Sequence, residues 1–146
     1  MTTVISVLTT SKIGIWNIPM RGQNFINNHY ANINNYKVSF IYQEGLLFNN
    51  FYMLESIIKK NSNNKVVIVF CSNLQLLNLK RSKKEFINFF KKYEIHFALE
   101  LQKGKGTNFL NNIFKELSEF SRKNNVDVKK INTYQALFKK YKSKII

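Results

Sequence analysis

Two glutamates and an arginine stand where predicted strands end, and these residue types bind sugars or move protons. Arg21 follows the first predicted strand, Glu44 the second and Glu100 the fourth. Ser72 and Asn73 follow the third. Because parallel strands end at one edge of a sheet, we expect these side chains to share that edge. The set predicts a site that binds a polyol or shares a proton, with Glu44 and Glu100 as candidate catalytic groups and the others as ligand-binding groups.

Gln23 and His96 are two further candidates for ligand binding. Gln23 lies in the same predicted loop as Arg21, and His96 lies within the fourth predicted strand. A simpler interpretation applies to every residue of this set, namely that it has no function, since strand ends carry polar residues in any protein. His96 alternates with apolar neighbours, which is also typical of a core or surface histidine. Cys71 ends an apolar run and is predicted to be inert packing.

Several stronger signatures are missing from the sequence. Gly104 and Gly106 are too closely spaced for a phosphate-binding glycine loop, and no Gly-x-Ser-x-Gly elbow occurs. His29 and His96 are the only histidines and Cys71 the only cysteine, which makes a structural zinc site improbable. We therefore predict no metal and no cofactor.

Four strands and four helices are expected to position these residues. The predicted strands are Lys12–Trp16, Lys37–Tyr42, Val66–Cys71 and Ile95–Leu99. The predicted helices are Gln23–Ile33, Asn50–Lys60, Ser82–Tyr93 and one that follows Lys103–Gly106 with Thr107 as its N-cap. The apolar stripe of the first helix is expected to comprise Phe25, Ile26, Tyr30 and Ile33.

The alternation of strands and helices predicts an α/β three-layer sandwich. Its sheet is short, mostly parallel and four- to five-stranded, with helices on both faces. We expect residues 12–125 to form this domain. Residues 1–11 are expected to be an N-terminal extension, either an added edge strand or a frayed end. Residues 126–146 are expected to be a basic segment that packs on the same domain.

The composition favours a folded cytoplasmic protein. Hydrophobic residues make up 45% of the 146, which is enough for a core. No apolar run approaches the ~20 residues that span a bilayer. Met1–Thr10 has no basic segment before its apolar residues, so no signal peptide is predicted. A single cysteine excludes an internal disulfide framework.

The net charge of +15 invites a nucleic-acid interpretation, which we do not favour. The basic residues are 20 lysines and only 3 arginines, and 21 asparagines and 16 isoleucines accompany them, as in the codon usage of an AT-rich genome. Residues 1–58 carry a net charge of +1 and residues 59–146 of +14. A solvated basic face is the simpler explanation, and a nucleic-acid site in the second half remains the alternative.

The predicted order of elements resembles the catalytic domain of serine recombinases, but the chemistry of that family is missing. Asn17-Ile18-Pro19-Met20 stands where the nucleophilic serine is expected. Asn50-Phe51 and Ser72-Asn73-Leu74 replace the family's arginine-bearing motifs. Strand exchange needs the serine and those arginines, so an active recombinase is not expected.

The sequence also resembles the sporadic carbohydrate cluster protein family, a degenerate relative of the resolvase domain, over roughly residues 12–120. The matching residues are Pro19, Arg21, Gln23-Asn24, Tyr30, Glu44, Tyr52-Met53-Leu54, Ser72-Asn73-Leu74, Arg81 and His96-Phe97-Ala98-Leu99-Glu100. The resemblance implies a resolvase-like fold, adds Tyr52 to the ligand-binding set, and implies a role linked to lipopolysaccharide, O-antigen or capsule gene clusters. Leu46, Leu47 and Phe48 depart from the family's pattern, which leaves the ligand open.

Three hypotheses of function follow. The first is the synthesis or modification of a surface polysaccharide, with a sugar or nucleotide sugar bound at the strand ends. The second is a non-catalytic interaction module whose partner is a glycan-pathway enzyme or a second copy in a homodimer. The third is a DNA-binding resolvase relative that uses Lys80–Lys92 and Arg122–Lys144. The sequence leaves open whether the protein is an enzyme.

Overall fold

The middle layer of the structure is a five-stranded sheet. Its strands are β1 (Thr2–Thr9), β2 (Phe40–Glu44), β3 (Lys65–Phe70), β4 (Glu94–Phe97) and β5 (Gln102–Gly104). They lie in the order β2-β1-β3-β4-β5. The first four are parallel, and β5 is antiparallel to β4. The computed structural model describes residues 2–45, 50–77 and 79–121.

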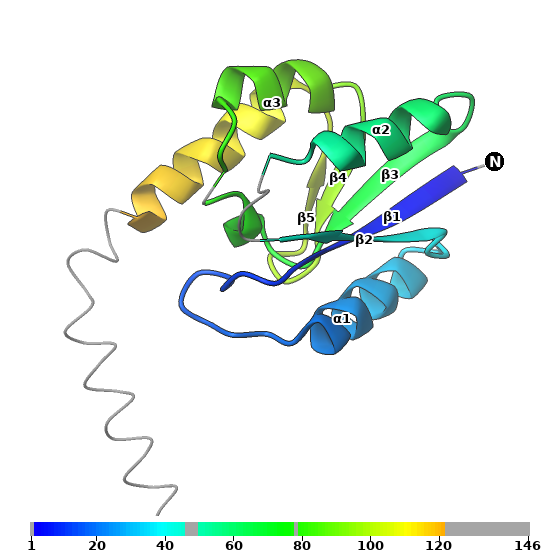
Figure 1. Cartoon of the computed structure of the whole chain (residues 1–146), viewed down its shortest axis with the longest axis horizontal. Coiled ribbons are helices and arrows are strands. Elements are labelled where there is room, and N and C mark those ends of the chain that lie inside the picture. The colour runs from blue at the N-terminus through cyan, green and yellow to red at the C-terminus, as the bar shows by residue number, and fades with distance from the viewer. Residues whose placement is uncertain (1, 46–49, 78, 122–146) are drawn as a thin grey trace, which may run out of the picture.

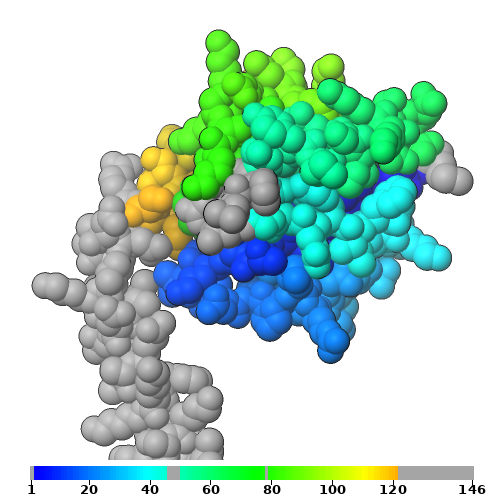
Figure 2. All heavy atoms as spheres, viewed as in Figure 1, coloured from blue at the N-terminus to red at the C-terminus, as the bar shows by residue number. Residues whose placement is uncertain are grey.

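Helices cover both faces of this sheet, which confirms the predicted α/β sandwich. They are α1 (Met20–Ile33), α2 (Tyr52–Lys60), α3 (Lys83–Phe90) and the helix at residues 107–121. Figure 1 shows α1 on one face of the sheet, with α2, α3 and the last helix on the other. In the space-filling view of Figure 2, the cyan side chains around β2 lie on the surface between these two layers. Within the described ranges, no helix is long and apolar enough to cross a membrane.

The N-terminal segment is a strand, as one of the two expectations held, but it is no extension and does not lie at an edge. Residues 2–9 form β1, which pairs with β2 on one side and β3 on the other. Its residues Thr3–Thr9 are all buried, because this strand is covered on both faces. The predicted strand Lys12–Trp16 is instead a turn, closed by a single bridge between Ile13 and Trp16. Gly14 provides the positive φ of 64° that this turn requires.

The other predicted strands are correct with small shifts, and β5 is an addition. Val66–Cys71 and Ile95–Leu99 correspond to β3 and β4, and Lys37–Tyr42 corresponds to the later β2. β5 replaces part of the loop predicted at Lys103–Gly106. The predictions for residues 126–146 lie outside the described residues.

The two faces of the sheet differ in chemistry. The larger core lies under α2, α3 and the last helix, where Phe70, Phe86 and Phe97 are fully buried. The smaller core lies under α1 and includes Val4, Val67 and Val69.

The apolar stripe predicted for α1 is correct in part. Tyr30 is buried and Ile26 packs against the smaller core, whereas Phe25 is 73% exposed and Ile33 is 68% exposed. The other buried residues of α1 are Gln23, Asn27 and Ala31. Gln23 and Asn27 face the sheet because the strands beneath them offer polar partners. Helical periodicity alone therefore missed the polar part of the buried side.

Candidate functional site at the carboxyl edge of the sheet

A pocket lies where β1 ends and α1 begins. It has a volume of about 300 Å³ and is lined by Thr9, Thr10, Ser11, Asn17, Ile18, Pro19 and Met20. Its lining comes from the β1–α1 connection alone, and β1 is one of the two strands at the switch point of the sheet, where the chain leaves β1 and β3 toward opposite faces. Pockets at such points are the usual ligand sites of open parallel sheets.

The wall of this pocket combines apolar and polar residues. Ile18, Pro19 and Met20 contribute apolar surface, and Thr9, Thr10, Ser11 and Asn17 contribute hydroxyl and amide groups. The first turn of α1 adjoins it, and no side chain caps the N-terminus of that helix. A helix N-terminus favours negative charge, so the wall is suited to hydroxyl and anionic groups. Arg21 lies in the same first turn and is exposed.

Gln23 holds the two ends of the pocket loop together. Its Oε1 accepts a hydrogen bond from the backbone N–H of Thr9 at 2.9 Å. Its Nε2 donates to the backbone oxygens of Thr9 at 2.8 Å and Ile18 at 2.7 Å. Gln23 is fully buried. The side chain predicted to bind ligand is therefore occupied by the backbone, and its role is to position the loop.

Ser72, Asn73 and Glu100 meet between the ends of β3 and β4. Ser72 Oγ donates to Glu100 Oε1 at 3.0 Å, and the backbone N–H of Asn73 donates to the same oxygen. Asn73 Nδ2 donates to Gln102 Oε1 at 3.2 Å. The sequence predicted that these three residues share an edge, and the geometry brings them into direct contact. Burial raises the pKa of Glu100 above its ordinary value, although its two donors act in the opposite direction.

Ser72 also begins the short 3-10 helix η2 (Asn73–Leu76). Its hydroxyl accepts from the backbone N–H of Leu74 at 3.1 Å, and Gln75 Oε1 accepts from the backbone N–H of Ser72 at 3.1 Å. This is a capping box. The neighbouring Cys71 is fully buried, and burial raises the pKa of its thiol to about 12. Its thiolate is therefore suppressed at neutral pH, in agreement with the prediction of inert packing.

Glu44 is held at the end of β2. Tyr42 donates its hydroxyl to Glu44 Oε2, and the backbone N–H of Asn50 donates to Glu44 Oε1 at 3.2 Å. Glu44 is 2% exposed. Burial, together with the hydrogen bond to Glu44, raises the pKa of Tyr42.

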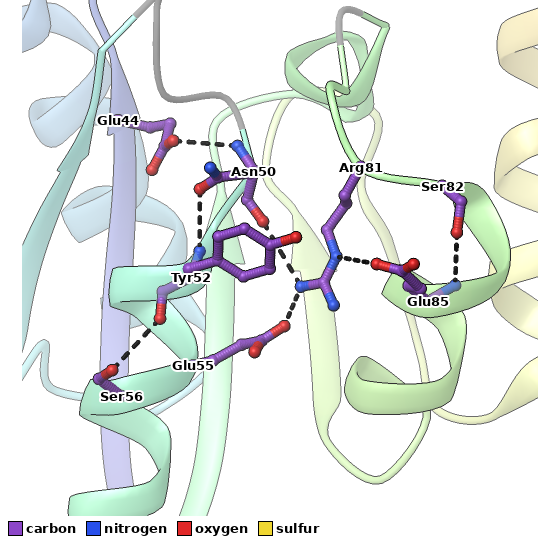
Figure 3. Close-up of polar contacts among 8 residues, drawn as sticks. All are labelled: Glu44, Asn50, Tyr52, Glu55, Ser56, Arg81, Ser82 and Glu85. Atoms are coloured by element: carbon purple, nitrogen blue, oxygen red, sulfur yellow. Dashed lines mark hydrogen bonds and ion pairs between the residues drawn. The ribbon is translucent and has the colours of Figure 1, made fainter.

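A cluster around Arg81 adjoins Glu44 (Figure 3). Arg81 Nη1 pairs with Glu55 Oε1 and lies 3.4 Å from the backbone oxygen of Asn50. The ring of Tyr52 stacks on the guanidinium at 4.9 Å. The Arg81 side chain is 7% exposed, whereas Tyr52 is 50% exposed. Three of the residues singled out by the family resemblance, Glu44, Tyr52 and Arg81, are thus brought together through Asn50.

Glu44 and Glu100 are held in different places on the carboxyl edge. Glu44 ends β2, whereas Glu100 accepts hydrogen bonds from Ser72 and Asn73 at the end of β3, and β1 lies between β2 and β3. Each glutamate is held by its own local donors. The two carboxylates therefore belong to separate hydrogen-bonded groups.

His96 lies away from the carboxyl edge. It faces α1 from within β4, is 1% exposed, and has Tyr30 Oη 2.8 Å from its Nδ1. Its Nε2 lies 2.9 Å from Glu94 Oε1. Both ring nitrogens are thus engaged inside the protein, which favours the competing interpretation of His96 as a core histidine.

Thr9, Thr10 and Ser11 were not proposed as site residues from the sequence, and Arg81 was not paired with Glu55. The threonines and the serine were missed because residues 1–11 were expected to be an extension and not a central strand, although their run of β-branched residues signals a strand. Within the described ranges, no three His, Cys, Asp or Glu side chains gather as metal ligands would. Comparisons of this chain with family models, curated proteins and solved structures found no match.

Proposed function

We propose that this protein binds a sugar phosphate or nucleotide sugar in the β1–α1 pocket and acts in the cytoplasm in surface-polysaccharide biosynthesis or modification. The observation that carries the proposal is the pocket itself, which lies in the β1–α1 connection, beside the switch point of a parallel sheet. Its hydroxyl and amide groups match the hydroxyls of a sugar. The uncapped N-terminus of α1 and the nearby Arg21 match a phosphate.

The volume limits the size of the ligand. About 300 Å³ is at the lower end of small-molecule pockets, which suits a single sugar phosphate or the phosphate-bearing part of a larger nucleotide sugar. The resemblance to the carbohydrate cluster family supports a carbohydrate as the class of ligand. A resolvase-like origin of the sheet is part of the same proposal.

The acid–base candidate for catalysis is Glu100, because burial raises its pKa above the ordinary value and the hydroxyl of Ser72 lies beside it. Glu44 is enclosed by Tyr42 and Asn50. We therefore propose ligand binding as the primary activity, with Glu100 as the group to test for turnover.

Isothermal titration with a sugar phosphate, a nucleotide sugar and the corresponding free sugar tests the binding. The phosphorylated ligands should bind and the free sugar should bind more weakly. Asn17→Ala combined with Arg21→Ala should weaken binding by about tenfold or more, as expected when a charge-assisted hydrogen bond is lost. The matched control is Asn63→Ala with Lys37→Ala, two exposed residues near the opposite edge of the sheet. Equal binding by both double variants would overturn the proposal.

A non-catalytic interaction module is the second candidate, and the outer side of α1 favours it. Phe25 and Ile33 are exposed there, and Ile41 on the edge strand β2 is 56% exposed. Exposed apolar side chains of this size are typical of contacts with a partner. Light scattering of the wild type and of a Phe25→Ser, Ile33→Ser variant tests it: a dimer that the variant abolishes supports the module, and a monomer in both counts against self-association.

A further inference from the structure

The amino edge of the sheet, opposite the pocket, carries a dense group of lysines. Strands β2, β3 and β4 begin at this edge, and α2 and α3 end there, as Figure 1 shows at the upper right for α2 and β3. The exposed lysines that this geometry collects are Lys37, Lys59, Lys60, Lys65, Lys91, Lys92 and Lys105. We call this surface the lysine edge.

Each lysine has its own place in the chain, and the fold unites them. Lys59 and Lys60 form the last turn of α2, and Lys91 and Lys92 directly follow α3. Lys65 begins β3, and Lys105 follows β5, which ends beside the start of β4 because the two strands are antiparallel. Parallel topology sends both helix C-termini to one edge, so residues distant in sequence form one surface.

The charge of the lysine edge is nearly unopposed. Glu94 is the single carboxylate among the described residues at this edge. It is engaged by Lys65 Nζ at 3.2 Å and by His96 Nε2 at 2.9 Å. Cations near helix C-termini are individually stabilising, which explains some of the positions. The stabilisation of two helix C-termini does not require seven lysines on one edge. Together the seven lysines create a strongly positive potential.

The chemistry of the lysine edge favours an anionic bilayer over a nucleic acid. The described arginines, Arg21 and Arg81, are at the other edge, although Arg is the usual residue for bidentate contacts to phosphate and guanine. Two of the aromatic rings at the lysine edge lie beneath lysines: Lys59 Nζ is 5.7 Å from the Phe89 ring centre, and Lys65 Nζ is 5.9 Å from that of Tyr36. These two rings are therefore not presented for stacking on bases.

We propose that the lysine edge is an electrostatic docking surface for an anionic phospholipid membrane. Separate ammonium groups on long side chains suit a diffuse layer of lipid phosphates. Each lysine near the surface raises the constant for binding an anionic membrane by roughly fivefold. Docking by this edge leaves the opposite, carboxyl edge and its pocket directed away from the lipid. The attachment is peripheral and reversible, and it weakens as salt screens the charges.

Vesicle co-sedimentation of the full chain tests the proposal. The vesicles contain phosphatidylcholine alone or with about one third phosphatidylglycerol, at low salt and at about 0.5 M salt. Binding is expected only to the anionic vesicles and only at low salt. Lys59→Glu, Lys60→Glu, Lys92→Glu should reduce that binding by at least about 100-fold, following the effect per lysine.

The matched control is Lys80→Glu, Lys83→Glu, Lys84→Glu, which makes the same change of charge near the start of α3, at the carboxyl edge. Equal losses in the two triple variants would show that net charge alone acts, and would overturn the proposal. Binding of duplex DNA that depends on the lysine edge, without vesicle binding, would overturn it in favour of a nucleic acid. Circular dichroism checks that each variant folds. If the first variant does not fold, Lys59→Gln, Lys60→Gln, Lys92→Gln replaces it, with an expected loss of about 100-fold from the three lost charges.

Discussion

The hydroxyl of Tyr30 on α1 lies 2.8 Å from Nδ1 of His96 on β4, and this contact joins the helix to the sheet within the interior. On the other side of the ring, Nε2 contacts Glu94, which in turn pairs with Lys65. A carboxylate only accepts hydrogen bonds, so Nε2 carries the proton of the neutral ring, and Nδ1 accepts from Tyr30. Both ring nitrogens of the neutral tautomer therefore have a partner.

Removing the Tyr30 hydroxyl should destabilise the fold. Tyr30→Phe leaves Nδ1 of His96 buried without a donor, and we expect the free energy of unfolding to fall by about 1–3 kcal/mol. Urea denaturation measures this change. Tyr52→Phe is the matched control, because the ring of Tyr52 is 50% exposed and water can replace its hydroxyl contacts. Similar losses in both variants would contradict the assigned role of the hydroxyl.

Gln23 should matter more for the pocket than its neighbours on α1. Gln23→Ala leaves the backbone groups of Thr9 and Ile18 without their side-chain partner, and we expect a loss of about 2–4 kcal/mol in the free energy of unfolding. Asn24→Ala, at a partly buried neighbour, should cost less than about 1 kcal/mol. Urea denaturation compares the two. If Gln23→Ala were as mild as Asn24→Ala, the loop would not depend on this amide.

The stability of the protein should depend on the ionisation of Glu100. Its pKa is raised in the folded state by burial, so the folded state holds this proton more tightly than the unfolded state. Stability is then fully present below the unfolded pKa and decreases as pH rises through the folded pKa.

Glu100→Gln removes this dependence. Its amide oxygen still accepts from Ser72 and Asn73 but cannot ionise, so the variant should exceed the wild type in stability at pH 7 and approach it at pH 4. Denaturation at both values of pH measures the difference, and Glu100→Ala, which loses the acceptor, should be less stable than Glu100→Gln. A wild type more stable than Glu100→Gln at pH 7 would show that the ionised form is preferred.

The Arg81–Glu55 pair should be sensitive to the loss of one partner. The side chains are 7% and 14% exposed, so Arg81→Met leaves a largely buried carboxylate, at an expected cost of about 3–5 kcal/mol. Adding Glu55→Met should recover much of the loss, because two apolar groups then face each other. A double-mutant cycle in urea measures the coupling. Additive losses would indicate that the two side chains act independently.

The sequence by itself determined the class of the fold and several of its elements. A continuous apolar run predicts a strand covered on both faces, and Val66–Cys71 is such a strand because its side chains avoid water in either direction. The period of α2 and α3 predicts helices whose buried residues include Leu54, Phe86 and Phe90. The alternation of strands and helices along the chain then predicts a parallel sheet. A parallel sheet in turn predicts the shared edge where Ser72, Asn73 and Glu100 meet.

Tertiary structure alone decided which polar residues face inward and which strand occupies the centre. The buried side of α1 depends on Thr9, Ser6 and His96, which contact it only after the strands pair. Residues 2–9 lie in the centre because neighbours on both sides complete their hydrogen bonds. These choices rest on contacts between residues distant in the chain, which local periodicity does not encode. The lysine edge arises in the same way, since it exists only once the strands are parallel.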